Sequence, residues 1–161
     1  MEIALVLARM AAGGYFVWSA STKLGKTQKF WSEIMGYKLT GARTSGVLAS
    51  VIIPVQFIAG LYFSAGISPF ATGVALLALL LVFTAAMSVS LARKTGNNCG
   101  CGGKEEKVRP ILIVRNAALS ALVVGGMFSS TPTYPGEPVV LAAGAIVAAV
   151  IAVGSYRQLA R

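Results

Sequence analysis

Long apolar segments are the feature that most limits what this chain can fold into. Five of them approach the ~20 residues that a helix needs to cross a ~30 Å hydrocarbon core, and they cover residues 3–22, 46–66, 69–92, 110–129 and 138–156. Only 12% of the 161 residues are charged, whereas a soluble domain has about 25%. We therefore predict an all-α fold, a polytopic membrane helical bundle that forms a single membrane domain over residues 1–161.

The first apolar segment is expected to remain in the protein as a helix. It is longer than the apolar core of a cleavable signal peptide, and Glu2 precedes it where a signal peptide carries basic residues. All five segments are rich in alanine and glycine, which predicts close packing of the helices.

A short amphipathic stretch follows the first segment. In KTQKFWSEIMGYKL, the apolar side chains Phe30, Trp31, Ile34 and Met35 fall on one helical face. This pattern predicts an interfacial helix over about residues 27–36 that lies in the headgroup region. Such a helix either caps the bundle or serves partner docking or substrate entry.

Basic residues gather on one side of the predicted membrane. Twelve of the fourteen lysines and arginines fall in residues 23–43, 93–109 and the C-terminal tail, whereas the connections 67–68 and 130–137 hold none. Basic loops stay in the cytoplasm, so we predict an outside N-terminus and a cytoplasmic C-terminus and loop 93–109. The chain is then an integral protein of the prokaryotic inner membrane. Its net charge of +9 indicates contact with anionic lipid rather than nucleic acid.

The chain has no histidine and no aspartate, and its five acidic residues are all glutamate. These absences exclude a Ser-His-Asp hydrolase, a histidine-ligated haem and a histidine-ligated zinc site. The remaining candidates for chemistry are the cysteines and the basic residues within the apolar segments.

Cys99 and Cys101 are the only cysteines, and they lie in the polar stretch TGNNCGCGGKEEKVRP. Gly100 between them permits the sharp bend that a disulfide at this spacing needs, and a strained disulfide is readily reduced. Basic neighbours such as Lys104, and the positive end of the helix that begins near Pro110, favour the thiolate, while two adjacent glutamates oppose it. The pattern favours a redox-active thiol pair at the membrane surface.

The same thiols leave two other interpretations open. Two thiolates do not fill a tetrahedral zinc site, but a linear soft ion such as Cu(I) or Hg(II) takes two, which would make the chain a soft-metal or sulfur-compound carrier. Alternatively the cysteines are inert, and the chain is a non-catalytic accessory subunit of a larger respiratory or other electron-transfer complex, packed through its small-residue helix faces.

Arg115 and Asn116 form a second candidate pair. Arg115 follows Pro110 by five residues, a depth of roughly 7.5 Å along a helix. Its side chain either extends back to the headgroups or faces the bundle interior. In the interior it would stabilise a thiolate or bind an anionic or quinone-like oxygen. Arg9 lies at a similar depth from the other face, so the two arginines are not expected to act together.

Several of these motifs resemble the MauE branch of the DoxX-like membrane proteins. They are Arg9, the SASTKL and KFWSEIMGYKL stretches, the Cys-Gly-Cys-Gly loop and VRNAALSALVV, and together they span roughly residues 5–128. The resemblance implies a four-helix core, to which segment 138–156 adds a fifth transmembrane helix. It implies thiol redox work, with a thioredoxin-like partner and possible reduction of a quinone.

The resemblance also carries over individual residues. Cys99 and Cys101 match the family's Cys-x-Cys pair, and Arg115 and Asn116 match its Arg-Asn motif. Arg9 and Lys23 match its first-helix motif. The implied function is a membrane thiol-disulfide oxidoreductase or electron relay, with quinone near Arg115. Disulfide maturation of secreted proteins takes place outside the cytoplasm, whereas the basic loops predict a cytoplasmic thiol pair.

Overall fold

The computed structural model describes residues 2–93, 108–129 and 137–159, and it contains six helices and no strand in those ranges. The helices are α1 (Glu2–Leu24), α2 (Thr27–Gly36), α3 (Ala42–Ala65), α4 (Pro69–Ala92), α5 (Pro110–Met127) and α6 (Glu137–Leu159). All except α2 are long and apolar enough to cross a membrane. The predicted all-α polytopic membrane fold is therefore confirmed; that the whole chain forms one domain stays a prediction.

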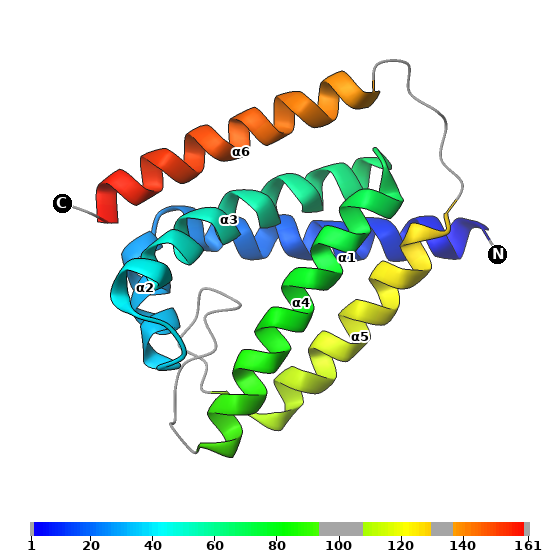
Figure 1. Cartoon of the computed structure of the whole chain (residues 1–161). Coiled ribbons are helices and arrows are strands. Elements are labelled where there is room, and N and C mark those ends of the chain that lie inside the picture. Colours follow the sequence, from blue (N-terminus) through cyan, green and yellow to red (C-terminus); the bar gives the residue numbers. More distant parts are fainter. Residues whose placement is uncertain (1, 94–107, 130–136, 160–161) are drawn as a thin grey trace.

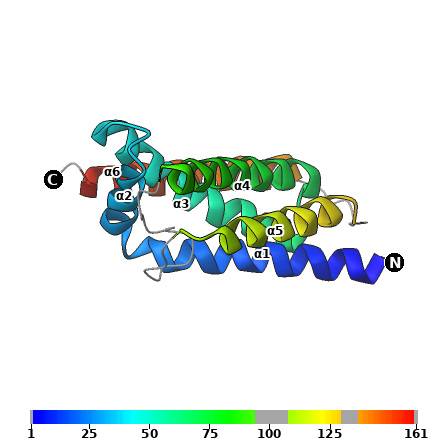
Figure 2. The same cartoon turned by 90° about the horizontal axis from the view of Figure 1, so that it is seen from below.

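The long helices run alternately up and down, with α2 at one end of the bundle (Figures 1 and 2). At the α2 end, α1, α4 and α6 finish and α3 and α5 begin. Helix α3 is central, because it packs against α1, α2, α4 and α6. The α2 end is therefore also where loop 93–109 leaves α4 and enters α5.

Helices α1 and α3 pack closely because small residues face each other at their crossing. A Cβ atom added to Gly13 would lie 2.6 Å from the Gly60 carbonyl oxygen and would collide with Ser64, and one added to Gly60 would lie 2.9 Å from Cβ of Phe16. Next to this contact, Phe16 and Phe63 join a buried apolar core. The structure thus uses the small residues for close helix packing, as the sequence predicts.

A tight turn joins α3 to α4, and the two helices diverge from it at an angle. Gly66 adopts a left-handed conformation with φ of 80°, and Ile67 N–H donates to the Tyr62 carbonyl at 2.9 Å, which closes the end of α3. Pro69 then begins α4. From this turn α4 runs obliquely away from α3 toward the α2 end (Figure 1). The divergence leaves room between α2, α3 and α4.

Helix α6 lies along α3 and is mostly exposed. The Tyr62 hydroxyl donates to the Val140 carbonyl at 2.7 Å, and Gly144 lies against the same ring. Exposed side chains such as Val139, Ile146 and Val150 are apolar, as expected of a helix that faces lipid.

Candidate functional site

The predicted cysteine site lies outside the described residues. Cys99, Gly100, Cys101 and Lys104 all fall in residues 94–107, so their arrangement stays a prediction. The structure does describe the residues on either side of this segment. Val108 packs against the buried side chains Met87 and Leu112, which belong to α4 and α5.

Lys23 occupies a different position from the one the sequence suggested. It was assigned to the basic loop 23–43, but it belongs to the last turn of α1 and is only 3% exposed. The span 3–22 was defined by apolarity, and helix α1 continues beyond it. The Lys23 ammonium donates to Ser19 Oγ at 3.2 Å and to Gln56 Oε1 at 3.1 Å. The boundary of the predicted loop at residue 23 was therefore wrong, because α1 continues to Leu24 and two polar groups inside the bundle bind the Lys23 ammonium.

Aromatic rings complete the surroundings of this ammonium. The Lys23 nitrogen lies 5.0 Å from the ring centroid of Phe30 and 5.5 Å from that of Phe83. These distances are within the range of cation–π attraction, which strengthens where water is excluded. Rings on α2 and α4 therefore help α1 and α3 to hold one buried positive charge.

Lys23 and Asn116 line the same small cavity, which we call the polar chamber. Its volume is about 10 Å³, close to the ~10–15 Å³ that one water molecule requires. The polar chamber is lined by Tyr15, Phe16, Ser19, Lys23, Gln56, Leu80, Phe83, Asn116 and Leu119. At this size the cavity holds at most one water molecule.

Asn116 is anchored between two helices. It is 3% exposed and donates from Nδ2 to Thr84 Oγ1 at 3.1 Å, while the Thr84 hydroxyl donates to the Leu80 carbonyl at 2.7 Å. These bonds link α5 to α4 beside the polar chamber. They also fix the orientation of the amide.

Arg115 lies within the bundle against α1. Its guanidinium carbon is 6.0 Å from the ring centroid of Tyr15, and its Nε and Nη2 atoms are buried. The residue as a whole is half-buried, so its side chain lies against α1 at the side of the bundle. Tyr15 also lines the polar chamber, so Arg115 lies next to the chamber without lining it.

Arg9 lies at the opposite end of the bundle. It precedes Lys23 by fourteen residues on α1, or about 21 Å at 1.5 Å per residue. Its Nη1 donates to Ser129 Oγ at 2.9 Å, and its guanidinium packs against Gly66. Arg9 therefore ties α1 to the end of α5 and to the α3–α4 turn, apart from the other candidate residues.

Sequence reasoning missed several of the residues that complete the chamber. Gln56, Ser19 and Tyr15 were not among the candidates from sequence, and neither was Thr84, which binds Asn116 beside the chamber. The available signal was a glutamine within an apolar span together with a lysine four residues after a serine. Polar side chains within membrane spans usually face the bundle interior.

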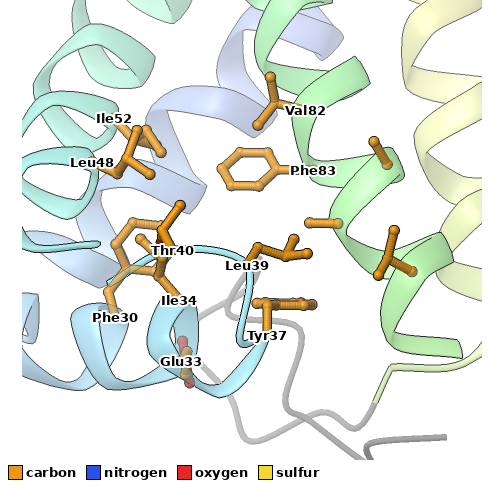
Figure 3. A pocket seen from close by; sticks show the side chains of 13 residues that line it. Phe30, Glu33, Ile34, Tyr37, Leu39, Thr40, Leu48, Ile52, Val82 and Phe83 are labelled. Carbon is orange, nitrogen blue, oxygen red and sulfur yellow. The ribbon is translucent and has the colours of Figure 1, made fainter. Parts of the chain in front are cut away.

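A larger, apolar pocket adjoins the polar chamber. It has a volume of about 340 Å³, and its walls come from α2, the α2–α3 connection, α3 and α4. Phe30 and Phe83, the two rings beside the Lys23 ammonium, also line this pocket. We call it the lateral pocket (Figure 3).

Fold and site together define a polytopic helical membrane protein with a buried cation at one end of the bundle. The protein-family model for Methylamine utilisation protein MauE matches residues 1–129, so the chain belongs to the MauE family. The match covers α1 to α5 and every residue of the polar chamber, and it ends before α6.

A curated relative agrees with this family. The chain is 32% identical over 114 residues to the Methylamine utilization protein MauE of Paracoccus denitrificans, which covers 68% of this chain and 60% of the relative. The matched region thus spans about three fifths of the relative's length. No solved structure matches the chain.

Proposed function

We propose that this chain is a membrane thiol-disulfide relay that serves methylamine utilisation. Cys99 and Cys101 cycle between a dithiol and a disulfide, and the substrate is the dithiol of a partner protein of thioredoxin-like chemistry. The observation that carries the proposal is a Cys-Gly-Cys segment in a MauE-family chain, tethered at the same end of the bundle as the buried Lys23. The DoxX-like relationship and the roles of Arg115 and Asn116 remain part of this proposal.

The exchange proceeds in two balanced steps. A thiolate of the partner attacks one sulfur of the Cys99–Cys101 disulfide, which forms a mixed disulfide and releases the other cysteine as a thiolate. The second thiolate of the partner attacks its own bridged sulfur and releases the remaining cysteine. The partner loses two electrons and becomes a disulfide, while Cys99 and Cys101 gain them.

The charge distribution of the structure supports a cytoplasmic site for this exchange. Exposed basic side chains cluster at the α2 end, namely Lys26, Lys38, Arg43, Arg93, Arg109 and Arg157. Among the described residues, the opposite end carries only the buried Arg9 as a basic side chain. We accordingly propose an inner-membrane protein with its N-terminus outside and the thiol segment in the cytoplasm.

One observation favours a second candidate function. Helix α6 lies outside the family match, and most of its apolar surface is exposed. A non-catalytic accessory subunit would use such a surface to pack against a larger membrane complex. Loss of both thiols without loss of function would favour this alternative.

Single cysteine variants test the relay directly. We expect Cys99→Ser or Cys101→Ser to trap the oxidised partner, because the remaining thiolate attacks the partner's disulfide in the reverse of this exchange and this chain has no second cysteine to displace the partner as a dithiol. The adduct is measured on non-reducing gels of membranes from cells that express the full chain. The control is the double variant C99S/C101S, which must show no adduct. If neither single variant yields an adduct that dithiothreitol dissolves, the relay is disproved.

A further inference from the structure

We propose that Arg9 and the α3–α4 turn bind a phosphate group at the end of the bundle opposite α2. The site consists of the Arg9 guanidinium, the Ser129 hydroxyl, Gly66 and the first turn of α4. It contains no cysteine and lies at the far end of α1 from Lys23, so it does not depend on the thiol relay. The proposal rests on a buried positive charge that the described residues do not balance.

Arg9 is a buried charge with a neutral partner. It is 7% exposed, and its Nη1 donates to Ser129 Oγ at 2.9 Å. Its Nε atom is buried and has no hydrogen-bond partner among the described residues. Glu2, the acidic residue of α1, lies seven residues earlier, about 10 Å along the helix axis, and is exposed. Removing an unbalanced charge from water is unfavourable, and a bound anion offsets that cost.

Two glycines fix the position of this guanidinium. A Cβ added to Gly66 would lie 2.9 Å from Nη1 and 3.0 Å from Nη2, and one added to Gly126 would lie 2.9 Å from Cβ of Arg9. Ser129 Oγ donates to the Gly126 carbonyl at 2.8 Å, which orients the hydroxyl that accepts from Nη1. The adjoining edge of the guanidinium, formed by Nε and Nη2, is the one that binds two oxygens of a single oxyanion in parallel.

The start of α4 adds a second positive feature to the site. Gly66, against which the guanidinium packs, lies three residues before Pro69, the first residue of α4. Ser68 precedes this helix and makes no side-chain capping bond to it. The positive end of the α4 dipole therefore lies beside Arg9, and helix N-termini favour anions.

The position of the site along the bundle selects phosphate among the anions. Arg9 contacts the α3–α4 turn and, through Ser129, the end of α5, so it lies where three of the long helices end or begin. Helix α1 extends past this level (Figures 1 and 2). In a bilayer such helix ends lie in the headgroup layer, where lipid phosphates are found. Phe70 and Phe128, close in sequence to the turn and to Ser129, are 65% and 72% exposed and suit contact with acyl chains.

Lipid binding by the full chain in an uncharged detergent tests the proposal. Native mass spectrometry counts the molecules bound from dioctanoyl-phosphatidylglycerol and from dioctanoylglycerol, which has the same chains without the phosphate. We expect the lipid with the phosphate to bind at least about tenfold more tightly. Inorganic phosphate then identifies the source of the group: displacement of the lipid shows that the site takes free phosphate, and retention shows that it takes a lipid headgroup. Equal binding of the two dioctanoyl lipids would overturn the proposal.

Two matched variants locate the binding. Arg9→Gln and Lys26→Gln each remove one positive charge, and Lys26 is exposed at the α2 end. We expect R9Q to bind dioctanoyl-phosphatidylglycerol at least about tenfold more weakly than the unmodified chain, and K26Q to bind it as tightly. Arg9→Lys keeps the charge but loses the edge of Nε and Nη2, so its affinity should lie between the two. Equal affinities of R9Q and K26Q would overturn the site, because binding would then follow net charge alone.

Photolabelling of the unmodified chain keeps the proposal testable if R9Q does not fold. A phosphatidylglycerol with a photoactivatable headgroup is irradiated with the protein in lipid nanodiscs, and labelled peptides are mapped by mass spectrometry. We expect label on the N-terminal half of α1 and on the α3–α4 turn, in addition to label at the basic α2 end. Label confined to the α2 end would contradict a phosphate site at Arg9.

Discussion

Gly13→Val is expected to lower the free energy of unfolding by about 3 kcal/mol. An added Cβ at this position would lie 2.6 Å from the Gly60 carbonyl oxygen and 2.8 Å from the Ser64 backbone nitrogen, besides colliding with the Ser64 hydroxyl. Backbone atoms of α3 cannot move aside as a flexible side chain does. The helices must therefore separate, which opens the core beneath them around Phe16 and Phe63.

The neighbouring glycine provides a matched control for this prediction. A Cβ added to Gly14 meets no atom within 4 Å, so Gly14→Val changes helix propensity as Gly13→Val does but leaves the packing intact. The measurement is thermal unfolding in detergent micelles, followed by far-ultraviolet circular dichroism. A melting temperature that falls equally in both variants would show that α1 and α3 do not cross at Gly13.

Lys23→Ala is expected to destabilise the protein by about 2–4 kcal/mol. The substitution removes the donor to Ser19 Oγ and Gln56 Oε1, and both acceptors are buried inside the bundle. It also leaves a cavity between the Phe30 and Phe83 rings. Lys23→Met keeps most of the side-chain volume, so we expect it to lower the free energy of unfolding by less than Lys23→Ala.

Lys26→Ala is the control for the loss of charge. Lys26 is exposed, and surface substitutions of this kind change stability by less than about 0.5 kcal/mol. Lys23→Ala and Lys26→Ala each remove one basic residue near the α1–α2 connection. The difference between their free energies of unfolding therefore measures the contribution of the buried contacts of Lys23. Equal stability of K23A and K26A in the same unfolding assay would mean that Lys23 is solvated rather than held in the polar chamber.

The sequence predicts the fold well because a membrane permits few kinds of secondary structure to cross it. A long apolar segment in hydrocarbon must satisfy its own backbone hydrogen bonds, and a helix does so within the segment. Helix ends are less predictable. Helix α3 begins at Ala42 although the apolar run begins at Gly46, because Arg43 and Thr44 are exposed at its first turn and apolarity does not mark them.

The candidate site is predictable only in part. Arg115 and Asn116 stand out because ionisable and amide side chains in a span need partners. The burial of Lys23 depends on Gln56, which is 33 residues away, and a lysine at the end of a span ordinarily extends to the interface. The lateral pocket results from the angle between α3 and α4, and no local pattern encodes that angle.

The relay is tested most directly by the redox behaviour of the two cysteines. Membranes that contain the full chain are equilibrated across a series of dithiol/disulfide buffers, and mass-tagged alkylation counts the free thiols of Cys99 and Cys101. Membrane-permeant and impermeant reagents in intact cells show from which side the thiols are reached. The account predicts a reversible two-electron transition, with thiols reached only from the cytoplasm. Thiols that never pair at any potential would contradict it.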